Sequence, residues 1–299
     1  MAIIEVESKK IYIEEYGRDN KDTIVYFHGG PGASCLDFIC QAKALGMNFR
    51  VISFDQYGVM RSEAIKEHEF FGMYDHIRLI DKIRKELNIE SWTILGHSYG
   101  GMLACLYAHE YPAYTDRIIY DCPSWNYILS AKSIASFYMS YFTMHAIKEG
   151  VDACNVILKK GYENRAEVFN DLFIVLNLVK DEKERNYLHS ISAEEYRANF
   201  MPQEIPADGW KKGNTHIQKL FDAGEILKDY RPLLKKIKCP SLLLEGKYDP
   251  ACGEDQRDYF LNNSPKGKVV IFENSGHFAR IEEPEAYTGA IVDFMNTAI

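Results

Sequence analysis

Apolar and polar positions alternate along the first 121 residues in a rhythm of short apolar runs and longer amphipathic stretches. Continuous apolar runs are typical of strands that are buried on both faces of a parallel sheet. Four such runs occupy residues 23–27, 50–54, 92–96 and 117–121. Apolar residues at helical spacing occupy 36–44, 74–87 and 102–111. This order predicts an α/β fold, a mostly parallel sheet with helices on both faces, extended by two edge strands within residues 3–16.

The rhythm changes after residue 122 and resumes after residue 234. Residues 123–234 contain successive amphipathic segments and no convincing strand. These segments are 132–149, 151–160, 165–180 and 193–200. The later strands and helices are expected at 239–245, 256–262, 268–272 and 284–296. We therefore predict a core made of residues 1–122 and 235–299, with a helical cap, residues 123–234, inserted between two sheet strands.

Composition excludes several classes of protein. The 299 residues are 46% hydrophobic and carry a net charge of −8, which argues against a nucleic-acid partner because phosphate binding needs a basic face. The N-terminal residues do not resemble a signal peptide, and no apolar run is long enough to span a membrane. The seven cysteines are scattered without a Cys-x-x-Cys pair, as expected of reduced cytoplasmic thiols, and no zinc-ligand spacing is present. We expect a cytoplasmic protein with no metal, no cofactor and no membrane partner.

A candidate nucleophile lies between a strand and a helix. Ser98 occupies the centre of Gly96-His97-Ser98-Tyr99-Gly100, directly after the run at 92–96. This order is typical of a nucleophile elbow, in which flanking glycines allow a sharp strand-to-helix turn. A serine hydroxyl is a weak nucleophile at neutral pH, so it requires a base, and the base requires an orienting carboxylate.

The later part of the chain offers both partners. His277 follows the predicted strand 268–272 in a glycine-containing loop, and we predict that it is the base. Asp249 follows the strand 239–245, in the order serine, acid, histidine. Asp121, at the end of the preceding core strand, remains an alternative acid.

An oxyanion hole needs two backbone N–H donors. The residue after the nucleophile, Tyr99, supplies one, and a glycine-rich loop after an early strand supplies the other. That loop is His28-Gly29-Gly30-Pro31-Gly32, and Gly30 is the preferred donor because Pro31 has no N–H.

Three segments together resemble the proline iminopeptidases, a family of α/β-hydrolases. They are His28–Gly32, Asp55-Gln56 and the Gly-His-Ser-Tyr-Gly-Gly at 96–101, and the resemblance covers residues 1–122 and 235–299. It implies the α/β-hydrolase fold and release of an N-terminal residue, often proline, from short peptides. It also implies that Ser98, Asp249 and His277 are catalytic and that Gly30 and Tyr99 form the oxyanion hole.

The chain departs from the family pattern at positions that concern substrate. Tyr57 and Met60 replace an arginine and a glycine of the second motif. The family holds the free α-amine of its substrate with glutamates, whose places correspond here to Gln218 and Pro250. A neutral amide does not balance a buried ammonium. Four other glutamates remain as substitutes: Glu194, Glu195, Glu204 and Glu225.

Two enzymatic hypotheses follow, and a third of another class. The first is an aminopeptidase of the proline iminopeptidase type, acting on short peptides. The second is a carboxylesterase or lactonase acting on an uncharged small molecule. The third is a binding protein that retains the fold without catalysis. The sequence does not indicate an oligomeric state.

The cap is expected to select the substrate. Gly29, Trp125 and Gln218 are candidate substrate-binding residues. An aromatic patch is expected to contribute to the roof of the pocket, and it consists of Phe137, Tyr138, Tyr141 and Phe142.

Overall fold

A computed structural model describes residues 1–162, 166–179, 186–200 and 205–297. Its centre is one eight-stranded sheet with the order β1-β2-β4-β3-β5-β6-β7-β8. The strands are β1 Ala2–Val6, β2 Lys9–Tyr16, β3 Thr23–Phe27, β4 Arg50–Phe54, β5 Trp92–His97, β6 Thr115–Asp121, β7 Ser241–Gly246 and β8 Gly267–Phe272. The pairs β1–β2 and β2–β4 are antiparallel and all later pairs are parallel. The predicted fold class is confirmed.

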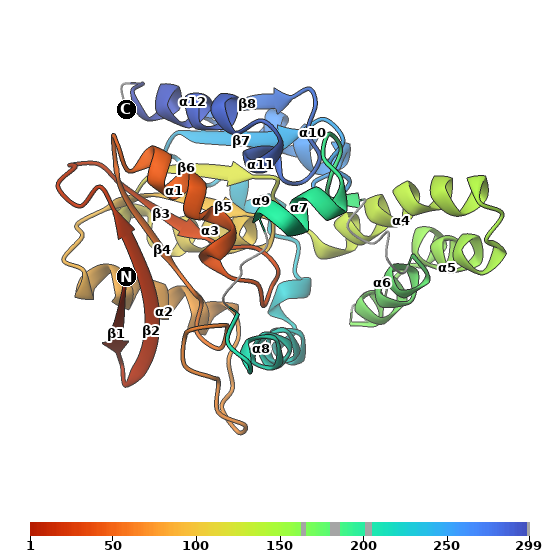
Figure 1. The fold of residues 1–299 in the computed structure, drawn as a ribbon, viewed down its shortest axis with the longest axis horizontal. Coiled ribbons are helices and arrows are strands. Elements are labelled where there is room, and N and C mark those ends of the chain that lie inside the picture. Colours follow the sequence, from red (N-terminus) through yellow and green to blue (C-terminus); the bar gives the residue numbers. More distant parts are fainter. Residues whose placement is uncertain (163–165, 180–185, 201–204, 298–299) are drawn as a thin grey trace.

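Both faces of the sheet are covered by helices (Figure 1). Alternate residues of β3 show the division, since Ile24 and Tyr26 join one apolar cluster while Val25 and Phe27 join the other. On one face lie α1 Ile39–Leu45 and α12 Pro284–Met295, and the other carries α2 Met73–Glu86, α3 Tyr99–Glu110 and α10 Glu254–Asn263. Two short helices, α9 Arg231–Leu234 and α11 Ala279–Glu282, flank β7 and β8 in the chain. Because the central strands are parallel, their carboxyl ends meet at one edge of the sheet, where the candidate catalytic loops begin.

The long connection between β6 and β7 is helical, as the amphipathic pattern predicts. It contains α4 Tyr127–Met144, α5 Lys148–Lys159, α6 Glu167–Leu178, α7 Ala193–Phe200 and α8 Gly209–Ala223. In Figure 1, α4, α5 and α6 project to one side of the sheet, whereas α8 lies apart from them beside the core. The boundaries of the cap at 122/123 and 234/235 remain a prediction.

Two details of these helices differ from the expectations. We expected one helix over 132–149, but α4 begins at Tyr127, where the Asn126 side chain accepts hydrogen bonds from the N–H groups of residues 128 and 129. It ends at Met144, close to Ala146 with a φ of 53°. Helix α8 was not among the expected segments, and it contains two weak helix formers, Gly209 at its first position and Gly213.

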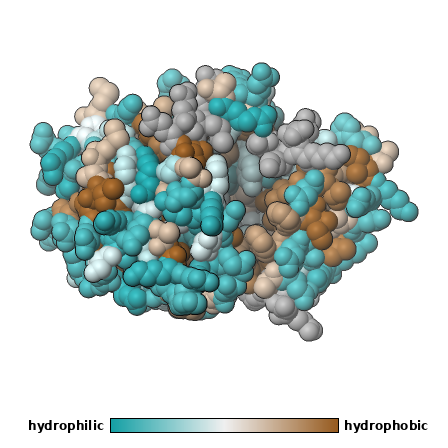
Figure 2. Space-filling view, turned by 60° about the horizontal axis from the view of Figure 1, so that its bottom comes forward, coloured by the Kyte–Doolittle hydropathy of each residue, from teal (hydrophilic) through white to brown (hydrophobic). Residues whose placement is uncertain are grey.

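Apolar surface gathers over the projecting helices. In Figure 2, brown surface covers much of the projecting part at the right, which contains α4, α5 and α6. The exposed apolar residues of α5 and α6 include Val156, Phe173 and Ile174. Among the described residues, no helix is both long enough and apolar enough to cross a bilayer.

Candidate active site

Ser98 lies at a strained turn between β5 and α3. Its φ of 53° and ψ of −117° are outside the regions that ordinary residues occupy, and the helix starts at the next residue. The neighbouring glycines make this turn possible: a Cβ on Gly96 would collide with the Gly100 carbonyl oxygen, and a Cβ on Gly100 would collide with that of Phe27. Ser98 is partly exposed at this turn, as expected of a nucleophile elbow.

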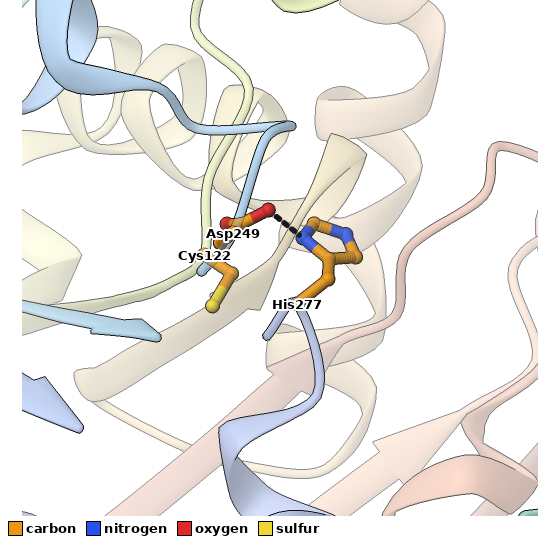
Figure 3. Close-up of side chains that lie close together, drawn as sticks. All are labelled: Cys122, Asp249 and His277. Atoms are coloured by element: carbon orange, nitrogen blue, oxygen red, sulfur yellow. Dashed lines mark hydrogen bonds and ion pairs between the residues drawn. The ribbon is translucent and has the colours of Figure 1, made fainter. Parts of the chain in front are cut away.

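His277 and Asp249 lie side by side at the ends of β8 and β7 (Figure 3). The Nδ1 atom of His277 lies 2.9 Å from Oδ1 of Asp249, and Nε2 lies on the opposite side of the ring. The backbone N–H groups of Ala251 and Cys252 also donate to the Asp249 carboxylate, at 2.7 and 3.3 Å. These bonds hold a carboxylate ready to orient the imidazole, so that Nε2 is left to exchange a proton.

The alternative acid, Asp121, has other partners. Its Oδ2 atom lies 3.1 Å from Nδ1 of His97 and 3.0 Å from a guanidinium nitrogen of Arg280. Burial lowers the pKa of His97 to about 4, so its ring is neutral at physiological pH. The rings of His97 and His277 are 4.7 Å apart, centre to centre. Asp121 therefore supports a residue that packs against His277, while Asp249 bonds to His277 itself.

The same close-up bears on whether a metal could bind. One possible ligand atom from each of Cys122, Asp249 and His277 lies within 4.8 Å of the others, and all three residues are buried. Nδ1 of His277 is already bonded to Asp249, however, and burial raises the pKa of the Cys122 thiol well above its ordinary value. A protonated thiol is a poor metal ligand. These residues fit a histidine–carboxylate pair better than a metal centre.

Both predicted oxyanion donors line the same cavity as Ser98. Tyr99 is the first residue of α3, where backbone N–H groups have no partner within the helix. Gly30 has a φ of 112°, which only glycine adopts readily. Two hydrogen bonds from Gln56 hold His28, the first residue of this loop. The Gln56 N–H donates to Nε2 of His28 at 3.1 Å, and the Gln56 side-chain amide donates to the His28 carbonyl at 3.0 Å. The first of these bonds needs a neutral His28, and burial lowers the pKa of that ring accordingly.

Two cavities meet at Ser98. Cavity A has a volume of about 240 Å³ and is lined by Gly29, Gly30, Ala33, Ser34, Asp37, Met60, His97, Ser98, Tyr187, Tyr196, Trp210, His277 and Phe278. Cavity B has a volume of about 130 Å³ and is lined by Gly30, Pro31, Ser98, Tyr99, Met102, Ser124, Tyr127, Ser130, Ala131, Ile134, Leu172, Leu176, Tyr187, Ile226 and Ala251. The candidate base therefore borders cavity A, while both candidate oxyanion donors border cavity B.

The three predicted substrate-binding residues lie in different surroundings. Gly29 lines cavity A. Trp125 is fully buried and stacks on Phe260, 5.6 Å between ring centres, on the core side of the cap. Gln218 is exposed on α8 and donates to Asp222 at 2.7 Å. Neither Trp125 nor Gln218 lines cavity A or B among the described residues, and their role in substrate binding remains a prediction.

The aromatic patch of α4 lies away from both described cavities. Phe137, Tyr138, Tyr141 and Phe142 pack among themselves and against neighbouring helices, and none of them lines cavity A or B. A different face of α4, containing Tyr127, Ala131 and Ile134, borders cavity B. The sequence shows aromatic residues on a helix but does not show which helical face meets the elbow.

The candidate amine-binding glutamates also lie away from the cavities. Glu194 and Glu195 are exposed on α7, and Glu225 accepts a hydrogen bond from the Tyr74 N–H at 3.3 Å. Glu204 lies outside the described residues. Asp37 is the one acidic residue among those described around either cavity, and its carboxylate is paired with Arg280 at 2.6 Å.

Sequence reasoning missed the groups that hold the His277 loop. Tyr187 lines both cavities, and its carbonyl accepts from the His277 N–H at 2.8 Å. The Glu282 carboxylate accepts from the Gly276 N–H at 2.6 Å. Arg280 is completely buried between Asp37 and Asp121. The sequence shows an arginine three residues after the candidate base, but it carries no signal that this arginine is buried or that Tyr187 and Glu282 contact the loop.

Comparisons with known proteins show the family and the fold. A family model described as "alpha/beta hydrolase fold" matches residues 22–284. A proline iminopeptidase of Heyndrickxia coagulans is 27% identical over 309 residues, covering 99% of this chain and 98% of its own. A protein of Leptolyngbya boryana named a probable proline iminopeptidase is 32% identical, covering 89% of this chain and 84% of its own. The solved esterase of Exiguobacterium antarcticum superimposes with a TM-score of 0.69 at 19% identity, over 99% of both chains.

Proposed function

Because the chain belongs to the proline iminopeptidase-like family of α/β-hydrolases and is a serine hydrolase, we propose that it cleaves carboxylic esters through an acyl-enzyme on Ser98. In this proposal Nε2 of His277 takes the proton of the Ser98 hydroxyl as the oxygen attacks the carbonyl carbon. Asp249 holds the imidazole and stabilises its charged form. The N–H groups of Gly30 and Tyr99 stabilise the developing oxyanion, each by about 3 kcal/mol.

The two cavities support a division between the acyl group and the leaving group. The protonated His277 returns its proton to the leaving group, so that group departs on the side where His277 lies, in cavity A. Water then enters, loses a proton to His277 and releases the acid from Ser98. The acyl group stays on the side of Gly30 and Tyr99, in cavity B, which is lined largely by apolar side chains.

One observation carries the choice of an uncharged substrate. Among the described residues that line either cavity, the single carboxylate is Asp37, and Arg280 already neutralises it. A substrate with a free ammonium group would lose its hydration there without gaining a counter-charge. We therefore propose an uncharged ester or lactone as the substrate class.

An aminopeptidase is the second candidate. It is favoured by the names of the two sequence relatives and by the His28–Gly32 loop, which resembles that of the proline iminopeptidases. The two candidates share the bond-breaking chemistry and differ in whether the substrate's amine is bound.

A comparison of three substrates separates the two candidates. We expect p-nitrophenyl acetate to be hydrolysed with a kcat/KM at least about 100-fold above that of proline p-nitroanilide, because an aryl ester is intrinsically more reactive than an anilide and nothing in the described cavities repays the desolvation of an ammonium. N-acetylation of the proline substrate should leave its low kcat/KM unchanged or raise it. The measurement is release of the chromophore at pH 7.5.

The opposite pattern would establish the aminopeptidase. In that case proline p-nitroanilide is the best substrate, and N-acetylation abolishes its cleavage. The matched control is the chain with Ser98 replaced by alanine, assayed with all three substrates, since it reports hydrolysis that does not involve the elbow.

The size of cavity B predicts a limit on acyl length. A volume of about 130 Å³ holds about four groups of the size of water or methylene. We expect kcat/KM for p-nitrophenyl esters to peak near butyrate and to fall by about tenfold or more by decanoate. Replacing Ile134 with alanine should move the optimum to a longer acyl chain, because Ile134 lines this cavity.

Val156→Ala is the matched control for that series, since Val156 is 49% exposed on α5 and lines neither cavity. Its acyl-length profile should equal that of the unmodified protein. An unchanged profile in Ile134→Ala, or an optimum at decanoate in the unmodified protein, would contradict the assignment of cavity B to the acyl group.

A further inference from the structure

Helix α8 touches the predicted oxyanion loop at two glycines. An ideal Cβ on Gly213 of α8 would lie 2.5 Å from the carbonyl oxygen of Gly32, and one on Gly32 would lie 2.8 Å from the carbonyl oxygen of Gly213. Both neighbours are backbone atoms, which cannot swing aside as a side chain can. The helix and the loop are therefore in direct backbone contact.

Side chains of α8 also form hydrogen bonds to backbone carbonyls of the segment that follows β4. Nδ1 of His216 lies 2.8 Å from the Tyr57 carbonyl. The ammonium groups of Lys212 and Lys219 donate to the carbonyls of Ser62 and Glu67, at 3.1 and 2.6 Å. These acceptors lie within residues 57–67, the segment that follows Gln56, and the Gln56 N–H and side chain hold His28 at the other end of the loop. One helix thus contacts the loop and the segment that supports it.

The loop is compact enough to transmit a displacement from Gly32 to Gly30. An ideal Cβ on Gly30 would lie 2.8 Å from the backbone nitrogens of both Gly32 and Ala33. Gly32 itself has a φ of 84°, a conformation that residues with a side chain rarely adopt. A backbone shift at Gly32 therefore changes the direction of the Gly30 N–H.

We propose that Gly213 is a positioning residue for catalysis, which sets the aim of the Gly30 N–H by allowing α8 to press on Gly32. The inference rests on the proposed oxyanion role of Gly30. It assigns α8 to the catalytic scaffold, although the helix lies in the segment predicted to be the cap. The chemical consequence concerns the transition state, because the oxyanion exists there and not in the bound ester.

The test is Gly213→Ala. The added methyl group must push the helix and the loop apart, so we expect kcat for p-nitrophenyl butyrate to fall by about 10- to 100-fold with KM changed by less than about threefold. The inhibition constant of a short alkyl trifluoromethyl ketone, which forms a tetrahedral oxyanion on the serine, should rise by a similar factor. Thermal unfolding is measured on the same samples.

Gly289→Ala is the matched control. Gly289 lies inside α12, and nothing is within 4 Å of a Cβ placed there. This variant should keep kcat and the inhibition constant within twofold of the unmodified protein. An unmodified protein that hydrolyses no ester would overturn the proposed function, whereas active unmodified protein with equally active Gly213→Ala would overturn only the positioning role.

Two further outcomes decide the inference. If kcat falls in Gly213→Ala while the inhibition constant of the trifluoromethyl ketone does not change, the oxyanion is not involved and the inference is wrong. If Gly213→Ala does not fold, Ile217→Ala replaces it, because the Ile217 side chain lies 3.0 Å from the Cβ position of Gly32 and its loss frees the loop without adding an atom. A several-fold lower kcat at unchanged KM then supports the inference, and an unchanged kcat contradicts it.

Discussion

Replacing Ser98 with alanine should lower kcat for an aryl ester by about 10⁶-fold, the effect of removing the nucleophile from other serine triads. The proposed acyl-enzyme forms on the Ser98 oxygen, and alanine leaves His277 with no hydroxyl to activate. The fold should be retained, because the strained turn depends on Gly96 and Gly100 rather than on the serine hydroxyl. Measurements of initial rates, together with labelling by a fluorophosphonate probe, check this result.

The matched control is Ser264→Ala, at a serine after α10 that lines neither cavity. It should keep both activity and labelling. Labelling of Ser98→Ala by the probe, or a loss of only tenfold in kcat, would mean that another residue is the nucleophile. Absence of labelling in the unmodified protein would favour the binding-protein hypothesis over both enzymes.

The features that the sequence predicts well depend on local backbone requirements. Gly96, Ser98 and Gly100 mark a turn whose geometry tolerates few other residues, so the elbow was recognisable before any packing was known. The continuous apolar runs at β3 to β6 required burial on both faces, which only a covered parallel sheet provides. Fold class and family were therefore predicted correctly, and the catalytic assignment remains a prediction.

The features that the sequence did not predict depend on how distant segments pack. Trp125 and Gln218 were chosen for their places in the chain, but the first is stacked in the core and the second faces solvent. Helix α8 was not among the predicted segments, and the small size of Gly213 is what allows its contact with Gly32. Local rules fail at this glycine because tertiary contact determines its role.

Asp249→Asn and Asp121→Asn should have opposite consequences. Asp249 accepts from Nδ1 of His277, and an amide at that position no longer holds the tautomer that leaves Nε2 free to accept a proton. We expect kcat to fall by about 10⁴-fold with little change in the free energy of unfolding. Rates with p-nitrophenyl butyrate and unfolding in urea measure the two effects.

Asp121→Asn should mainly cost stability. Burial alone would raise the pKa of Asp121, but His97 and Arg280 lower it below its ordinary value. The carboxylate is therefore charged, and it forms an ion pair with the buried guanidinium of Arg280. The amide leaves Arg280 with Asp37 as its remaining charged partner, and we expect a loss of about 3 kcal/mol in the free energy of unfolding. The rate should fall by less than about tenfold, because His97 supports His277 only by packing. A 10⁴-fold loss in Asp121→Asn, with a nearly full rate in Asp249→Asn, would make Asp121 the catalytic acid.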